Sequence, residues 1–193
     1  MILDITKELF LVLFVLGLFL FLLLKRYKKN RVRIWVWISL LIYTICLLKI
    51  TLFPIYIFDK TTLEAMRNGI EEYIVFYQYV PFVSIRNYFH MGAIIQLIGN
   101  LLLLIPAAIY MQIWTHAKIS VKKQVLFSLL ISIVIELLQL MINSITGFPG
   151  RVADIDDVIL NTVGVLLFSV FLYLIENNCS KQIREICNRL FYE

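Results

Sequence analysis

The chain has 193 residues, of which 61% are hydrophobic and 16% are charged, and its mean hydropathy is +0.88. A water-soluble domain of this length could not bury so much apolar surface, so the composition excludes a soluble globular protein and indicates a membrane protein. The formal net charge of +5 does not indicate a nucleic-acid partner, because the basic residues cluster beside hydrophobic runs. The three cysteines show no CxxC spacing, which indicates neither a disulfide framework nor a zinc site.

Five hydrophobic segments follow one another along the chain, and we interpret each as a helix that crosses a bilayer. Such a helix needs roughly 20 apolar residues. The first segment is slightly short for a span, and Ile5 and the flanking charges are able to extend it. The segments, in chain order, are residues 9–24, 34–53, 93–114, 125–145 and 155–175. We therefore expect an all-α, polytopic helical bundle that forms one membrane domain over residues 1–193.

The distribution of Lys and Arg predicts the orientation of this bundle. Six cations lie in the stretch "KRYKKNRVR" between the first two segments. Twelve of the 18 Lys and Arg residues fall on that side of the membrane and five on the other. By the positive-inside rule the richer side is cytoplasmic, so the N-terminus is expected outside and the C-terminus inside.

Two regions lie outside the predicted spans. Residues 54–91 form an outer segment that is rich in tyrosine and phenylalanine, which favour the membrane interface. We expect a short helix near Thr62 to Gln78 and then a re-entrant or surface-lying piece, because Pro81 interrupts a longer helix. Residues 177–193 place apolar side chains at helical intervals, which predicts an amphipathic helix on the inner surface.

The fifth segment begins with charges that a lipid-facing helix would not carry. Arg151, Asp154, Asp157 and Asn161 are separated by three, three and four positions, so they share one face of a helix that is expected to begin near Arg151. Asp156 points elsewhere. The helix dipole favours acids in a first turn, but it does not account for Asn161, which lies deeper in the span.

The fourth segment carries a matching polar face, formed by Glu136, Gln139 and Asn143. A carboxylate deep in a span costs at least a few kcal/mol if it faces lipid, so we expect this face to point into the bundle. Only about nine residues join the two segments, which predicts antiparallel neighbours. The two faces are then expected to meet in one outward-facing pocket, with Asn100 and Lys49 contributed by the third and second segments.

Several motifs resemble the VanZ-like family: "ELLQ" and "RVADIDDVILNTVG" strongly, and "TLFP", "YVPF" and "GNLLLLIP" more weakly. The resemblance covers about Trp37 to Tyr173. It implies a multi-pass protein of the bacterial plasma membrane that is associated with resistance to glycopeptides, teicoplanin in particular, and it implies no settled reaction. Where the family often has glycine after the proline of the third span, this chain has Ala107 and Ala108. Carried over by position, the family pattern points to Asn100, Glu136, Gln139, Arg151, Asp154, Asp157, Asn161 and Gly164.

Our preferred hypothesis is a binding pocket for a membrane lipid or a lipid-linked cell-wall intermediate, with a glycopeptide as a further candidate ligand. Arg151 would hold a phosphate or carboxylate, and Asn100 and Asn161 would orient it. An enzyme is an alternative, in which Glu136 acts as general acid or base beside Asp157 on a lipid headgroup. No nucleophile motif supports that alternative directly.

Two other functions and one structural role compete with this hypothesis. A small transporter or proton-coupled carrier would also use a buried acid on an amide-lined path. In the structural role, Arg151 pairs with Asp154 or Glu136 and the amides join helices without any ligand. A magnesium site formed by the three aspartates is disfavoured, because Asp156 points away from the other two, and no metal or cofactor is expected.

Overall fold

The computed structural model describes residues 2–3, 15, 17, 31–69, 75–115 and 119–192, with the backbone alone for 3, 31–33, 67–69 and 176–192. The elements in chain order are β1 (Ile2–Leu3), α2 (Arg31–Leu52), β2 (Ile55–Tyr56), α3 (Lys60–Gly69), β3 (Tyr77–Gln78), α4 (Val83–His90), α5 (Ile94–Leu103), α6 (Ile105–Trp114), α7 (Val121–Thr146), β4 (Ala153–Asp154) and α8 (Ile155–Tyr192). The predicted span at residues 9–24 lies almost wholly outside the described residues.

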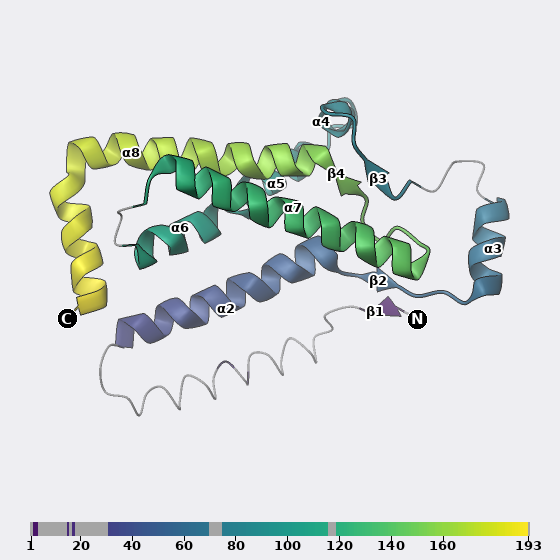
Figure 1. Cartoon of the computed structure of the whole chain (residues 1–193), viewed down its shortest axis with the longest axis horizontal. Coiled ribbons are helices and arrows are strands. Elements are labelled where there is room, and N and C mark those ends of the chain that lie inside the picture. The colour runs from purple at the N-terminus through teal and green to yellow at the C-terminus, as the bar shows by residue number, and fades with distance from the viewer. Residues whose placement is uncertain are drawn as a thin grey trace.

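Four predicted spans are confirmed as helical regions that are long and apolar enough to cross a membrane. They comprise Ile34–Leu52, Ile94–Trp114, Val121–Thr146 and Ile155–Ile175. The two polar-faced spans, in α7 and α8, lie side by side, and α8 packs against α7 more extensively than against any other described element (Figure 1). The close packing is expected from the short loop between them, which favours antiparallel neighbours.

The third span is two helices, where the sequence predicted one. The chain leaves helical geometry at Leu104, between α5 and α6, and Pro106 lies in the first turn of α6. Proline lacks a backbone N–H, so it is tolerated at a helix start and disrupts a helix interior. The break leaves Leu104 fully buried in a small apolar core with Ala108, Ile135 and Val165.

Short strands in the segments outside the spans correct the all-α expectation to a mostly helical fold. β1 pairs antiparallel with β2, and β3 pairs parallel with β4. In the second pair Tyr77 lies opposite Ala153 and Gln78 opposite Asp154. The helix predicted over residues 62–78 is therefore wrong at its end: α3 stops at Gly69, and the chain at 77–78 is extended.

The last helix begins later and continues further than predicted. It begins at Ile155 instead of near Arg151, because Ala153 and Asp154 belong to β4. It extends to Tyr192, so the expected helix in the tail continues α8. The side chains of that tail lie outside those described, and its amphipathic character stays a prediction.

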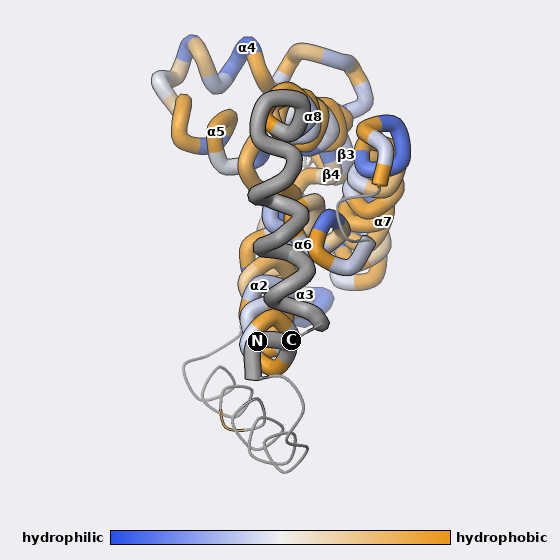
Figure 2. Tube along the Cα trace, turned by 90° about the vertical axis from the view of Figure 1, so that its left-hand side faces the viewer, coloured by the Kyte–Doolittle hydropathy of each residue, from blue (hydrophilic) through white to orange (hydrophobic). Residues whose placement is uncertain are grey.

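The distribution of polarity is the reverse of that in a water-soluble protein. Hydrophobic residues make up much of the helical trace, and hydrophilic residues are conspicuous at α4 (Figure 2). Many of the large hydrophobic side chains on these helices are exposed. The buried side chains of α7 are mostly polar: Gln124, Ser128, Ser132, Gln139 and Asn143 accompany Ile135. In lipid this arrangement is favourable, because apolar side chains need no burial there and polar groups find partners only inside the bundle.

Candidate functional site

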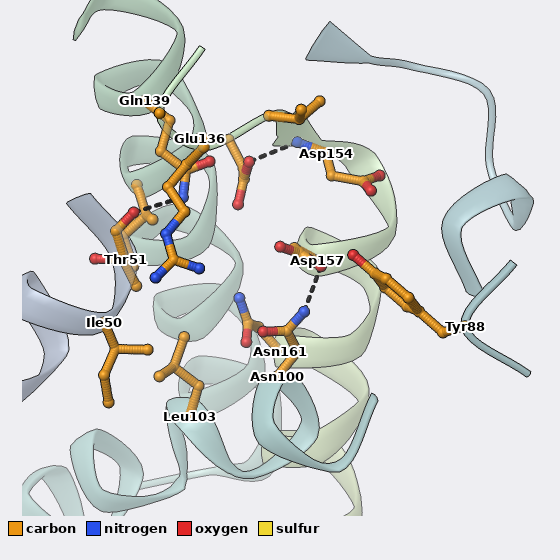
Figure 3. Close-up of a pocket in the computed structure, with 14 residues that line it drawn as sticks. Ile50, Thr51, Tyr88, Asn100, Leu103, Glu136, Gln139, Asp154, Asp157 and Asn161 are labelled. Atoms are coloured by element: carbon orange, nitrogen blue, oxygen red, sulfur yellow. Dashed lines mark hydrogen bonds between the residues drawn. The ribbon is translucent and has the colours of Figure 1, made fainter. Parts of the chain in front are cut away.

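A cavity of about 290 Å³ lies between α2, α4, α5, α7, α8 and the loop that joins α7 to α8. Side chains from these elements converge on it (Figure 3). Part of its wall is apolar and is formed by Ile50, Leu103 and Ile135. The seven residues predicted as ligand-binding all line it: Asn100, Glu136, Gln139, Arg151, Asp154, Asp157 and Asn161.

The side of the cavity formed by α7 carries Glu136 and Gln139, and both are held by the backbone of other elements. Glu136 Oε2 accepts a hydrogen bond from the backbone N–H of Asp154 at 2.7 Å. Gln139 Nε2 donates to the carbonyl oxygen of Thr51 at 2.9 Å. A carbonyl can only accept, so the second bond fixes the orientation of the Gln139 amide. The two bonds attach α7 to β4 and to the end of α2.

Asn143, one turn further along α7, positions the loop and does not line this cavity. Its Nδ2 donates to the carbonyl oxygens of Arg151, at 2.5 Å, and Phe76, at 3.3 Å. The helix ends at Thr146 and is capped by Gly147, whose φ of 68° is left-handed and favours glycine. The expectation that Asn143 belongs to the pocket is therefore corrected: it holds the loop that brings Arg151 to the cavity.

Arg151 is exposed at the edge of the cavity, and no carboxylate among the described residues forms an ion pair with it. Its Nη2 donates to the carbonyl oxygen of Phe53 at 3.4 Å, which is a long bond. The structural role considered above required Arg151 to pair with Asp154 or Glu136, and the described residues form no such pair. Most of the hydrogen-bonding capacity of the guanidinium thus remains for other groups.

The side formed by α8 carries Asp157 and Asn161, and each is bonded to a different helix. Asp157 Oδ1 accepts a hydrogen bond from Asn100 Nδ2 of α5. Asn161 Nδ2 donates to Ser132 Oγ of α7 at 2.8 Å, and Asn161 is only 1% exposed. These bonds explain why the polar face of α8 points inward. They connect α8 to α5 and α7, two of the helices that border the cavity.

Asp156, which the spacing excluded from the polar face, joins α8 to α4. Its two carboxylate oxygens accept hydrogen bonds from the backbone N–H groups of Phe82, at 2.6 Å, and Ile85, at 3.1 Å. These N–H groups lie at the start of α4, where the helix itself supplies no acceptor. Asp156 is fully buried, and Phe82 has a left-handed φ of 69°. The carboxylate therefore holds in place the helix that carries Tyr88 to the cavity.

Comparison with known proteins identifies the family. The profile of the VanZ/LLP1 family matches residues 40–176, which is more than half of the chain. The chain belongs to the VanZ/LLP1 family. No curated protein and no solved structure matches the chain significantly.

The matched region of the VanZ/LLP1 family contains every residue that lines the cavity. Of the eight positions taken from the family pattern, seven line the cavity, and Gly164 instead lies against the backbone of Leu101 in α5. The departure at Ala107 and Ala108 is accommodated, since Ala108 belongs to the apolar core with 3% exposure. A small side chain suffices at this helix contact.

The sequence did not predict that Tyr88 and Thr51 line the cavity, and Lys49, which it did predict, does not. Burial raises the pKa of the Tyr88 hydroxyl, the nearby carboxylates of Asp157 and Asp154 raise it further, and Arg151 opposes the shift. The phenol therefore stays protonated at neutral pH and can donate a hydrogen bond. Near Tyr88 the sequence offered only the "YVPF" motif, and that motif does not indicate that Tyr88 lies close to α8.

The acidic residues near the start of α8 do not form a metal centre in the part of the chain that the structure describes. No group of three or more His, Cys, Asp or Glu side chains there could hold an ion. The carboxylate of Asp156 is hydrogen-bonded to the start of α4, while Asp154 and Asp157 line the cavity. The arrangement is suited to hydrogen bonding and charge recognition, and Glu136 and Asp157 are its two candidate proton-transfer groups.

Proposed function

We propose that this VanZ/LLP1-family protein lies in the bacterial plasma membrane and binds the polar headgroup of a membrane lipid or of a lipid-linked cell-wall intermediate. The observation that carries the proposal is one cavity of about 290 Å³ that is lined by nine polar side chains from five helices, β4 and the loop before it. The outer surfaces of the same helices are apolar and suit a lipid surround. The apolar part of the wall gives the beginning of an acyl or polyprenyl chain a surface to contact.

Binding at this cavity would contribute to resistance to glycopeptides, teicoplanin in particular. The family's association with that resistance supports this step. When the protein binds a headgroup, less of that headgroup is free to bind an externally added antibiotic. The cavity would then have to open toward the outer side, as the distribution of Lys and Arg predicts.

The orientation can be tested by cysteine labelling of α3, which lies in the segment predicted to be outside. We expect Glu64→Cys, with Cys46, Cys179 and Cys187 replaced by serine, to react in intact cells with a membrane-impermeant maleimide. Glu64 is exposed, so the reagent can reach it. Labelling that occurs only after the cells are opened would reverse the orientation and contradict an outward-facing cavity.

Antibiotic susceptibility tests the function. In a Gram-positive host that lacks its own copy, we expect the wild-type protein to raise the teicoplanin concentration needed to stop growth. Glu136→Gln and Asp157→Asn should abolish most of this protection, because each removes a carboxylate from the cavity with almost no change of shape. Glu64→Gln, which removes a carboxylate far along the chain in α3, should protect like wild type.

The comparison requires equal amounts of each variant in the membrane, measured by immunoblot. Equal protection by all variants would show that the cavity has no role in resistance. No protection by the wild-type protein would contradict the resistance role. Conversion of an added lipid by the wild type, lost in Glu136→Gln, would instead favour the enzyme in which Glu136 and Asp157 transfer protons.

A further inference from the structure

The cavity presents more hydrogen-bond acceptors than the protein satisfies. Glu136, Asp154 and Asp157 each use one carboxylate oxygen, bonded respectively to the N–H of Asp154, the N–H of Asp156 and the amide of Asn100. The second oxygen of each has no hydrogen-bond partner among the described residues. Three carboxylate oxygens are thus left for other donors.

Two buried amides that line the same cavity also have unpartnered acceptors. Gln139 is 6% exposed and Asn161 is 1% exposed, and each donates its NH₂ group to the protein. Their oxygens, Oε1 and Oδ1, are buried without a partner in the described structure. A buried polar group that lacks its hydrogen bond costs about 1–3 kcal/mol, so both favour the arrival of a donor.

The donors that remain in the cavity wall are unevenly distributed. The guanidinium of Arg151 and the hydroxyl of Tyr88 keep donor capacity, and each amide NH₂ keeps one N–H, because its single hydrogen bond uses one of two hydrogens. Arg151 is exposed, whereas Asp154 is 5% exposed. Formal charge therefore divides the cavity into a cationic edge and an anionic interior.

This division refines the expectation that Arg151 receives a phosphate. A phosphate within the cavity would lie among three carboxylates and be repelled, since like charges in a site of low dielectric interact strongly. At the exposed edge it could bind Arg151 while a donor group on the same molecule reached the interior. A primary ammonium suits that interior best, because it has three donors, no acceptor and a positive charge.

We propose that the cavity recognises a primary ammonium group on a phosphate ester, with the ammonium between Glu136 and Asp157 and the phosphate at Arg151. This inference rests on the proposed headgroup binding and names its chemical class. The size agrees, since about 290 Å³ equals the volume of roughly ten water molecules at about 30 Å³ each. An aminoethyl phosphate headgroup fits such a space.

The test uses the full-length protein in a nonionic detergent and three short-chain phospholipids, with binding measured by thermophoresis. Phosphatidylethanolamine carries the primary ammonium, phosphatidylcholine replaces its three N–H donors with methyl groups, and phosphatidylglycerol keeps hydroxyl donors without the cation. We expect phosphatidylethanolamine to bind at least about tenfold more tightly than either of the others, a difference of about 1.4 kcal/mol. This comparison needs only the wild-type protein, so misfolding of a variant cannot produce it.

Variants then locate the preference within the cavity. Glu136→Gln and Asp157→Asn should reduce the preference for phosphatidylethanolamine. Arg151→Gln should weaken the binding of all three lipids by the same factor. Glu64→Gln, the control, should leave all three affinities unchanged. Soluble phosphoethanolamine is included as a competitor. If phosphoethanolamine competes at the same concentration as phosphatidylethanolamine, recognition of the ammonium group is supported and the lipid part is shown to be unnecessary for binding.

Two outcomes would separate the failure of this inference from that of the proposed function. Equal affinity for the three lipids, weakened by Arg151→Gln, would overturn ammonium recognition while headgroup binding stands. Absence of saturable binding for all three lipids and for phosphoethanolamine would overturn both. Unchanged preference in Glu136→Gln and Asp157→Asn would place the ammonium site outside this cavity.

Discussion

Replacing Gly164 with alanine is expected to destabilise the bundle strongly. A Cβ at this position would lie 1.8 Å from the carbonyl oxygen of Leu101 and 2.7 Å from its carbonyl carbon. Both are backbone atoms of α5, so the clash cannot be relieved by turning a side chain. Overpacking a well-packed interior costs about 1–3 kcal/mol and occasionally more, and here α5 and α8 must separate.

The measurement is the melting temperature of the full-length protein in detergent, followed by light scattering or by the fluorescence of a thiol-reactive dye. Gly99→Ala is the matched control, because Gly99 lies in α5 and a Cβ there meets no atom within 4 Å. We expect this control to melt at or above the wild-type temperature, since alanine favours helix by about 1 kcal/mol over glycine. Equal melting temperatures of Gly164→Ala and Gly99→Ala would contradict the close contact between α5 and α8.

Replacing Asp156 with alanine is expected to detach α4 from α8. The change leaves the partly buried N–H groups of Phe82 and Ile85 without their acceptors, and the loss of a typical hydrogen bond costs about 0.5–1.5 kcal/mol. The left-handed φ of Phe82 loses its main support at the same time. The helix that carries Tyr88 should then move away from the cavity while the membrane helices stay folded.

Hydrogen–deuterium exchange tests this prediction locally. We expect the peptides that contain Phe82 and Ile85 to exchange faster in Asp156→Ala, and those of α7 to keep their protection. Asp59→Ala is the control, because the Asp59 carboxylate accepts a hydrogen bond from the N–H of Thr62 at 3.2 Å at the exposed start of α3. Its effect should be confined to α3. Unchanged exchange at α4 in Asp156→Ala would show that other contacts hold that helix.

Seven polar residues of the cavity could be selected from the sequence, largely because of two local rules. Polar side chains three and four positions apart share a helix face, and a face with Glu136 or Asn161 avoids lipid at membrane depth. The short loop between the two helices then made their faces meet. No reaction could be selected in this way, since the same residue types serve binding, proton transfer and transport.

The roles of Asp156, Tyr88 and Thr51 could not be predicted because they depend on contacts between distant parts of the chain. Asp156 meets Phe82 across 74 positions, and Gln139 meets Thr51 across 88. Helical spacing describes only neighbours within a few turns, and it cannot say which loop folds against which helix end. For the same reason the pairing of β3 with β4 could not be predicted from the sequence, because each strand has only two residues.

The sequence by itself determined that this protein is a helical membrane protein, where four of its spans lie, which faces of them are polar and to which family it belongs. Hydropathy and helical period decide these features locally, because lipid excludes unpaired polar groups wherever they occur. Only the tertiary structure decided the break at Leu104, the attachment of α4 by Asp156 and the excess of acceptors in the cavity. These depend on which donors and acceptors satisfy one another, and that is settled when distant segments pack together.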